Sequence, residues 1–420
     1  DLVWTEITEE NRKDVITLAV YYLDWDLRDQ ILQFNRHNTE YRIEVVDYYS
    51  SYEDWDEAIE QMMDDFTGDG GIDIIEISQL NARSLAAQGY LLDMQPYFDA
   101  NLNKDDYFEN VIDAGKVGDA LYVVSPYFSI LTAATKSELV DGKTDWTPSE
   151  FCEYVSNAQK ETGDSGFYSR DEVLSLFCMY NADAFVDWNT GECNFNSQEF
   201  IDILNLCAAF PEEIDWSVYE NANYPELISS GAIPVFYTSF YEVYEIQEYE
   251  LMADGELIFI GFPCGDECAP VAIGSNSSFA ISSTTDYADG AWEFIEYLIN
   301  EENQSMVSYN FPINKSALDN ILEEAATPEY QKDENGNMVE APKYTYGYDD
   351  LIMEIYAASE EDIAAVYELI GTARGNLFLD EEIYNIISEE AQAFFNGQKS
   401  VEEVAEIIQS RVKVYVAELL

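Results

Sequence analysis

The stretch VITLAVY, residues 15–21, is a continuous apolar run rich in β-branched side chains. Its length and composition predict a buried strand. Just beyond it, Leu27, Ile31 and Phe34 recur at helical spacing, which predicts a helix with one buried face. A buried strand that runs directly into an amphipathic helix is typical of an α/β fold.

The segments that follow repeat this alternation. Residues 41–47 predict a second strand, residues 57–66 a second helix and residues 72–77 a third strand. Residues 81–88 predict a further helix, ended by Gly89. Strands that alternate with helices at this pace predict a parallel sheet with helices on both faces.

Further along, the same signals predict shorter strands and several helices. Thr147 and Pro148 have the residue types of an N-cap and of a first helical position. Gly397 suits the position after a helix end, and residues 400–403 (SVEE) predict a capping box for the last helix. The other predicted elements are strands at 121–124, 233–237 and 257–261 and a helix over 291–298.

The charge of the chain is strongly negative: 19 Lys and Arg oppose 84 Asp and Glu, for a formal net charge of −65. Such a field repels phosphate backbones and anionic lipids, which argues against nucleic-acid or membrane-surface binding. The acids are spread along the whole chain, so they favour a solvated surface. With so many acids, a nearby pair of carboxylates carries little information about catalysis.

Metal and catalytic motifs have little support. The six cysteines form no CxxC pair, and the single histidine, His37, falls where a surface position of the first helix is expected. Cys264 and Cys268 suit either a small disulfide loop or free thiols. Residues 333–337 (DENGN) hint at a calcium loop, but the glycine is misplaced, which favours a hairpin turn. The sequence has no phosphate-binding loop, dinucleotide fingerprint or nucleophile elbow.

Aromatic and polar side chains gather where two predicted strands end. The first strand runs into residues 21–25 (YYLDW), and the third runs into residues 78–81 (SQLN). Sugars present apolar C–H faces beside many hydroxyls, so aromatic platforms next to carboxylates and amides suit them. Core packing of the rings and helix capping by Ser78 are the competing interpretations. The candidate ligand-binding residues here are Tyr21, Tyr22, Asp24, Trp25, Gln79 and Asn81.

Short motifs run in order along nearly the whole chain, from about Val15 to the C-terminus. They are 73–75 (DII), 89–94 (GYLLDM), 121–126 (LYVVSP), 261–263 (GFP), 291–295 (AWEFI), 311–315 (FPINK) and 395–400 (FNGQKS). In this order they resemble the family 1 extracellular solute-binding proteins, the maltose-binding-like group that serves carbohydrate ABC importers.

The resemblance implies a two-lobed α/β fold of the periplasmic-binding-protein type, with a hinge of crossing strands and a ligand cleft between the lobes. The N-terminal lobe would comprise residues 1–124 and 275–313, and the C-terminal lobe residues 125–274 and 314–420. It also implies a binding subunit without catalytic residues, metal or cofactor, which passes a small-molecule ligand, an oligosaccharide, to ABC permease subunits. The implied location is extracellular, with a lipid anchor in a segment upstream of this chain.

The resemblance adds candidates at the crossings and in the second lobe. Relatives place aromatic ligand contacts after the strand that matches residues 233–236, which points to Tyr237. Tyr384 matches a position where relatives offer an aromatic ring, with core packing as the alternative. Residues 182–184 (ADA) replace a Gly-Gly that carbohydrate binders often show. The full set of added candidates is Tyr127, Tyr180, Asn181, Tyr237, Ser239, Asn276 and Tyr384.

Two other functions are compatible with the sequence. The same fold binds peptides, polyamines or ligand-bound metals in other proteins, and the excess of acid suits cationic ligands. A glycoside hydrolase with a carboxylate pair is the enzymatic alternative, but no spacing singles out such a pair. The aromatic content of 14% favours a sugar over a metal as the ligand.

Overall fold

The chain forms two compact units. The computed structural model describes residues 12–419, apart from 53, 69, 141–142, 144, 163–167, 179–184, 189, 216, 218–222, 264–270, 276, 307–308, 349–350 and 375–380. Unit 1 comprises Asp1–Phe128, Ser275–Ser308 and Pro312–Leu318, and unit 2 comprises Ser129–Gly274, Tyr309–Phe311 and Asp319–Leu420. The chain therefore changes unit within a strand, β6 (Tyr127–Lys136), and within a helix, α13 (Lys315–Ala325).

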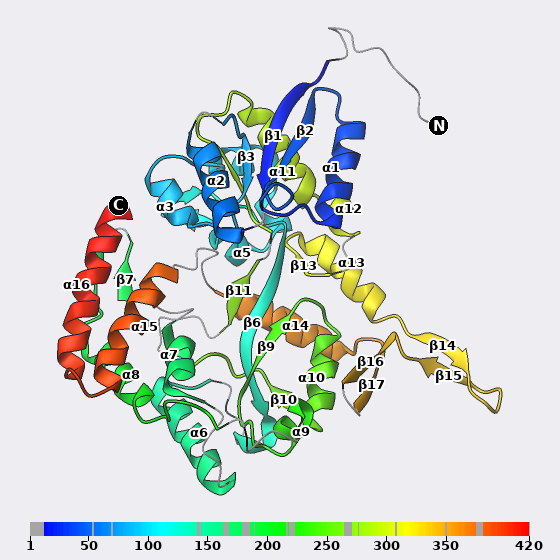
Figure 1. The fold of residues 1–420 in the computed structure, drawn as a ribbon. Coiled ribbons are helices and arrows are strands. Elements are labelled where there is room, and N and C mark those ends of the chain that lie inside the picture. Colours follow the sequence, from blue (N-terminus) through cyan, green and yellow to red (C-terminus); the bar gives the residue numbers. More distant parts are fainter. Residues whose placement is uncertain are drawn as a thin grey trace. The chain divides into compact units, whose positions relative to one another are not determined.

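Unit 1 is built on a four-stranded sheet in the order β12-β3-β1-β2 (Figure 1). The central strand β1 (Asp14–Val20) pairs in parallel with β2 (Tyr41–Asp47) and β3 (Ile74–Glu76). The fourth strand, β12 (Phe279–Ile281), is antiparallel to β3. The apolar run of β1 takes the central position, where both faces of a strand are covered. The predicted α/β class is confirmed, and the first three predicted strands pair in parallel. The expectation of a parallel sheet needs one correction, because the antiparallel β12 makes the sheet mixed.

Helices cover this sheet through apolar stripes. In α1 (Trp25–His37) the three predicted core residues, Leu27, Ile31 and Phe34, are buried. The Phe34 ring packs edge-on against Phe294 of α11 (Ala288–Ile299), with ring centroids 5.1 Å apart. The remaining elements of unit 1 are α2 (Trp55–Thr67), α3 (Ala82–Ala87), α4 (Gln95–Asn101), η1 (Lys104–Asp106), α5 (Glu109–Asp113), β4 (Lys116–Val117), β5 (Ala120–Leu121) and α12 (Glu301–Gln304).

The sheet of unit 2 is organised around β6. It pairs in antiparallel fashion with β9 (Phe236–Phe240), β10 (Leu257–Ile258) and β11 (Ala272–Gly274), and it also pairs with β13 (Phe311–Pro312). Most residues of β6 are buried. The helices of this unit are η2 (Ser137–Leu139), α6 (Pro148–Thr162), α7 (Arg170–Cys178), α8 (Gln198–Cys207), α9 (Tyr224–Ser229), α10 (Glu245–Ala253), α14 (Glu360–Thr372), α15 (Glu381–Phe395) and α16 (Val401–Leu419), with the short strands β7 (Val186–Asp187) and β8 (Glu192–Cys193).

The largest core of unit 2 lies among α6, α7, α8, α15 and α16, and it holds four buried free cysteines. Burial raises the pKa of the Cys152 and Cys178 thiols to about 12. These thiols behave as small hydrophobic groups, because the reactive thiolate is strongly disfavoured. The other two cysteines of the sequence, Cys264 and Cys268, lie outside the described residues.

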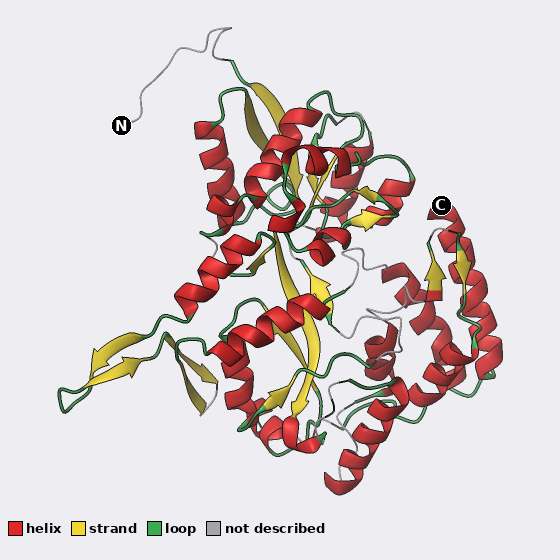
Figure 2. Cartoon of the chain, turned by 180° about the vertical axis from the view of Figure 1, so that it is seen from behind, coloured by secondary structure: helices red, strands yellow, loops and turns green. Residues whose placement is uncertain are grey.

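Two antiparallel ribbons follow α13. The first pairs β14 (Glu329–Lys332) with β15 (Met338–Ala341), and the second pairs β16 (Tyr344–Tyr348) with β17 (Leu351–Ile355). Figure 2 shows the first ribbon extending away from the helices of its unit. Its turn is closed by Asp333, whose carboxylate accepts the N–H of Asn335 and Asn337 at 2.8 Å. The hairpin turn predicted over residues 333–337 is confirmed.

Some predicted strands need correction. The strand expected at 121–124 shrinks to β5 and an isolated bridge between Val124 and Phe279, because residues 122 and 123 donate their N–H groups to Gly115. The strand expected at 233–237 begins only at Phe236 and runs to Phe240. The strand expected at 257–261 ends at Ile258. None of the helices that the structure describes is long and apolar enough to cross a membrane.

Candidate functional site

The carboxyl ends of β1 and β3 lie at the same edge of the unit 1 sheet, because the two strands are parallel neighbours. Tyr21 and Tyr22 directly follow β1, and Gln79 follows β3 within three residues. Tyr22 exposes 52% of its surface, and Gln79 is also exposed. The fold therefore brings the two candidate segments of the sequence to one edge.

Four rings form an aromatic cluster beside this edge: Tyr21, Tyr22, Tyr49 and Trp55. Tyr49 lies edge-on to Tyr21 and Tyr22, with ring centroids 5.8 and 5.4 Å apart, and Trp55 lies 6.3 Å from Tyr21. Tyr22, Tyr49 and Trp55 each expose about half of their surface. The exposed rings are not core residues, and their apolar area remains available to a ligand.

Two members of the aromatic cluster, Tyr49 and Trp55, were not among the residues predicted from the sequence. Tyr49 lies just beyond β2, and Trp55 is the first residue of α2. A signal for Tyr49 was present, because residues that follow adjacent parallel strands meet at the same edge. Trp55 carried no comparable signal, since its position depends on the path of the connection between β2 and α2.

Asp24 and Trp25 begin α1. The Asp24 carboxylate accepts the Leu27 N–H at 2.8 Å and so caps the helix. Trp25 exposes 76% of its surface, the largest fraction among the exposed large hydrophobic residues described, and the Arg28 guanidinium lies 5.2 Å from its ring centre. One oxygen of Asp24 therefore caps the helix. The Trp25 ring is largely exposed to solvent, as a ring that stacks on a sugar would be.

The end of β3 contains a second capping residue and a buried acid. Asn81, rather than the Ser78 considered from the sequence, caps α3 by accepting the Ser84 N–H at 2.9 Å. Glu76 is buried, and one of its oxygens accepts the N–H groups of Ser78 and Ser278, each at 3.1 Å. Burial raises the pKa of Glu76, and the nearby charge of Asp24 raises it further.

Tyr127 joins the start of β6 to α1. Its hydroxyl accepts a hydrogen bond from the Gln30 side chain at 2.6 Å. Burial raises the pKa of Tyr127 to about 12, with smaller contributions from the carboxylates of Asp26 and Asp24. The negative charge of Asp24 therefore acts on the Tyr127 hydroxyl within unit 1.

In unit 2, Tyr237 and Ser239 lie on the less buried face of β9, while their neighbours Phe236, Thr238 and Phe240 are buried. Tyr237 exposes 44% of its surface and packs against Phe262 at a centroid distance of 5.7 Å. The Oγ of Ser239 is buried and has no hydrogen-bond partner among the described residues. Tyr237 was expected just after a strand that ends at residue 236. It lies within β9 instead, because that strand begins only at Phe236.

The other candidates divide into two groups. Tyr384 is half-buried in α15 and packs against the largest core of unit 2, in line with the packing role weighed from the sequence. Tyr180, Asn181 and Asn276 lie outside the described residues.

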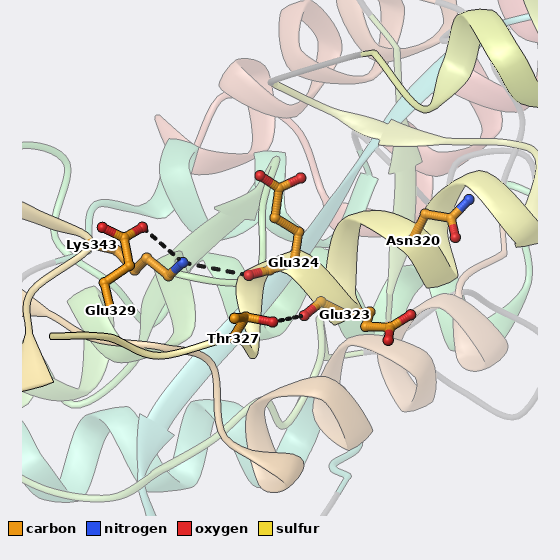
Figure 3. Close-up of a pocket in the computed structure, with 6 residues that line it drawn as sticks. All are labelled: Asn320, Glu323, Glu324, Thr327, Glu329 and Lys343. Atoms are coloured by element: carbon orange, nitrogen blue, oxygen red, sulfur yellow. Dashed lines mark hydrogen bonds and ion pairs between the residues drawn. The ribbon is translucent and has the colours of Figure 1, made fainter.

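A surface pocket of about 440 Å³ lies elsewhere in unit 2, lined by Asn320, Glu323, Glu324, Thr327, Glu329 and Lys343 (Figure 3). Its polar groups largely satisfy one another. Lys343 Nζ donates to the Glu329 carboxylate at 3.2 Å, and the Thr327 hydroxyl donates to the Glu323 carbonyl at 2.9 Å. The pocket contains none of the predicted ligand-binding residues. Within the described part of the chain, no group of three or more His, Cys, Asp or Glu side chains is arranged to hold a metal ion.

Comparison with known families gives one match. Residues 30–338 match the model of the family described as bacterial extracellular solute-binding protein. A comparison with curated protein sequences finds no match.

Many solved structures share the fold. The sugar-binding protein MalE from Xanthomonas citri is 15% identical, with a TM-score of 0.62, and the match covers 96% of this chain and 97% of that one. An ABC substrate-binding protein from Listeria monocytogenes, in complex with cycloalternan, is 14% identical with a TM-score of 0.57. The match covers 97% of this chain and 100% of that one. The cyclic α-maltosyl-1,6-maltose binding protein from Arthrobacter globiformis is 14% identical with a TM-score of 0.56. The match covers 96% of this chain and 99% of that one. The predicted fold class is confirmed by these neighbours.

Proposed function

The chain belongs to the bacterial extracellular solute-binding protein family, and we propose that it captures a sugar or oligosaccharide for an ABC transporter. The observation that carries the proposal is the exposed aromatic cluster of Tyr21, Tyr22, Tyr49 and Trp55 at the carboxyl edge of the unit 1 sheet. Ligands of open α/β sheets bind beyond this edge.

The chemistry of the edge suits a pyranose ring. Exposed tyrosine and tryptophan rings offer a flat apolar surface for the C–H face of a sugar. Their O–H and N–H groups can keep hydrogen bonds to water at the same time. Amide and carboxylate groups lie nearby on Gln79 and Asp24, which suits hydroxyl recognition.

We propose that the two units are the two lobes of the protein, with boundaries near residues 124, 274 and 313, and that they close on the ligand. Hinge closure around a ligand requires that each lobe supply one wall. In unit 2 the proposed wall is the face of β9 that carries Tyr237 and Ser239. Tyr237 supplies the exposed ring of this face, and Ser239 lies beside it on the same face of the strand.

The proposed role is binding and delivery without chemistry. The family is defined by solute binding, and the proposed partners are the permease subunits of an ABC transporter. The proposed location is the cell exterior, with lipid anchoring as the family resemblance implies.

A ligand screen tests the proposal. Thermal unfolding is followed in the presence of a panel of linear and cyclic oligosaccharides, with peptides and polyamines as matched non-sugar ligands. The proposal predicts that at least one saccharide raises the melting temperature in a concentration-dependent manner, because a ligand that binds only the native state stabilises it. Stabilisation by peptides or polyamines alone, or release of hydrolysed sugar from the hit, would overturn it.

A further inference from the structure

A network of buried polar side chains lies within unit 1 at the places where the chain leaves and re-enters that unit. Three short segments form these connections: the first at 125–128, the second at 275–278 and the third at 312–315. Gln304, at the end of α12, has no exposed surface. A fully buried amide is costly unless both of its ends are hydrogen-bonded.

The Gln304 amide uses both ends, and each end holds a different connecting segment. Its Nε2 donates to the carbonyl of Pro126 in the first segment. Its Oε1 accepts the backbone N–H of Asn314 in the third segment at 2.8 Å. The Pro126 carbonyl also accepts the Ile313 N–H at 3.2 Å, so the two segments are joined both directly and through Gln304.

Asn314 connects this pair of segments to the start of α13. Its side-chain oxygen accepts the Ala317 N–H at 3.1 Å, which caps α13. That helix runs from unit 1 into unit 2 without interruption. The hydrogen bond from the Asn314 backbone to Gln304 therefore fixes the start of the helix that leaves the unit.

The second segment is held by hydroxyl groups. Ser275 Oγ lies 3.1 Å from the Tyr127 carbonyl and 3.0 Å from the Ser277 carbonyl, so its proton bonds the first or the second segment. The hydroxyls of Ser125 and Ser278 are 2.6 Å apart and both are buried. Ser278 donates its N–H to Glu76 at the end of β3, which links the network to the candidate ligand edge.

We propose that Gln304 is a hinge-positioning residue: its amide locks the first and third connecting segments together and so fixes the directions in which the chain leaves unit 1. Buried polar groups with every bond made are rigid and specify one arrangement. The anchoring itself follows from unit 1 alone. Its consequence, control of how readily the lobes close, rests on the proposed function.

The test uses the ligand-free full chain and two near-isosteric variants. Gln304→Met keeps the volume of the side chain and removes both hydrogen bonds. Asn303→Leu is the matched control, because Asn303 is a buried amide in the same helix. Its side chain donates to the Tyr297 carbonyl at 2.6 Å and bonds none of the described residues of the connecting segments. Ser275→Ala is a second test of the network that keeps the Gln304 amide intact.

Hydrogen exchange followed by mass spectrometry reads out the connecting segments. We expect Gln304→Met to speed exchange of the amides at 313–318 by about tenfold or more, which corresponds to about 1.4 kcal/mol of local opening. Asn303→Leu should leave that region at the wild-type rate while it speeds exchange near 297–303. Ser275→Ala should speed exchange at 277 and 278 and leave 313–318 unchanged.

Equal acceleration at 313–318 in Gln304→Met and Asn303→Leu would reduce Gln304 to a packing residue and overturn the proposal. An unchanged rate at 313–318 in folded Gln304→Met would overturn it as well. These outcomes need no ligand, so a failure of the sugar-binding proposal leaves them intact.

Discussion

Trp25 and Tyr237 keep 76% and 44% of their surface exposed, although both are large aromatic residues at the start of a helix and within a sheet strand. Stacking of a sugar on such a ring contributes about 0.5–1.5 kcal/mol beyond the burial of apolar area. We expect Trp25→Ala and Tyr237→Ala each to weaken saccharide binding by about tenfold or more. Isothermal titration with the best saccharide from the screen measures this.

Tyr330→Ala is the matched control, because Tyr330 is 62% exposed on β14 and has no proposed contact with ligand. Its affinity should equal that of the wild type. All three variants should unfold within about 0.5 kcal/mol of the wild type if the rings are exposed platforms. Unchanged affinity combined with a loss of several kcal/mol in stability would show that Trp25 and Tyr237 are core residues instead.

Glu245 is an acid whose charge is unfavourable in the folded protein. Its carboxylate accepts the N–H of Tyr241 at 2.5 Å and of Glu242 at 3.1 Å in the turn that follows β9. Burial, with smaller contributions from the charges of Glu242 and Glu248, raises the pKa of Glu245 from 4.5 to about 7 despite these hydrogen bonds. The folded protein therefore holds this proton more tightly than the unfolded chain does.

The sign of the pH effect follows from that difference. Between about pH 4.5 and 7 the native state binds more protons at Glu245, so this residue's contribution to stability falls as the pH rises. We expect Glu245→Gln, which cannot ionise, to be more stable than the wild type at pH 8 by on the order of 2–3 kcal/mol and nearly equal at pH 4.5.

Denaturant unfolding across this pH range measures the effect. Glu256→Gln is the control, because Glu256 is exposed and its replacement removes the same charge without a buried site. A gain at pH 8 that persists unchanged at pH 4.5 would contradict the assignment to Glu245.

For single residues, the sequence predicts where a residue lies in the fold better than it predicts what its side chain contacts. Tyr22 and Trp25 could be placed near the carboxyl edge of the unit 1 sheet because they lie in the short connection after an unmistakable strand and at the helix start that follows it. Asp24 and Asn81 are predicted as ligand contacts, and one side-chain oxygen of each also caps a helix, because the residue types that suit a sugar also suit an N-cap. Residue type alone does not separate these two roles.

At the scale of single elements, the capping box at the start of α16 was predicted and is present. Ser400 Oγ accepts the Glu403 N–H at 3.2 Å, and the Glu403 carboxylate accepts the Ser400 N–H at 3.0 Å. We expect Ser400→Ala to lower the free energy of unfolding by about 1 kcal/mol. Denaturant unfolding gives the value.

Ser410→Ala is the control for this prediction. Ser410 is an exposed residue in the middle of α16, where its hydroxyl bonds the Glu406 carbonyl at 2.8 Å. Alanine has the higher helix propensity, so this change should be neutral or slightly stabilising. If the two alanine variants destabilise the protein equally, the cap contributes nothing specific.

The elements that were misplaced have identifiable physical causes. The strand expected from residue 233 begins at Phe236, because Pro234 has no N–H to give to a sheet and its carbonyl accepts the Thr135 hydroxyl at 2.7 Å. The apolar pattern alone does not show this. By contrast, β1 and β2 were predicted to within one residue, because continuous apolar or alternating runs leave little choice of register.

At the scale of the whole molecule, the formal net charge of −65 is the dominant feature. Mutual repulsion among the acids opposes the compact state more than the expanded one. The Debye length falls from about 30 Å at 0.01 M salt to about 3 Å at 1 M, so added salt screens this repulsion. We expect the free energy of unfolding to rise with sodium chloride over this range. Urea titrations at fixed pH measure it, and a fall with salt would contradict the expectation.

The order of motifs along the chain predicted the fold class, because α/β alternation is a local signal that survives at 15% identity to known structures. The candidate ligand site could not be predicted in this way. It depends on which loops meet at the edge of a sheet, as Tyr49 and Trp55 show, and on residues such as Ser239 whose surroundings are set by long-range packing. Those features follow from the three-dimensional arrangement rather than from sequence pattern.

We propose that the protein captures a saccharide by closing two lobes on it. Small-angle scattering during a titration with the best saccharide from the screen tests this claim most directly, with glycerol as the matched polyol that offers no ring face. Lobe closure predicts a radius of gyration that falls and saturates as saccharide is added, and that does not change with glycerol. A radius that stays constant while the saccharide binds to saturation would contradict it.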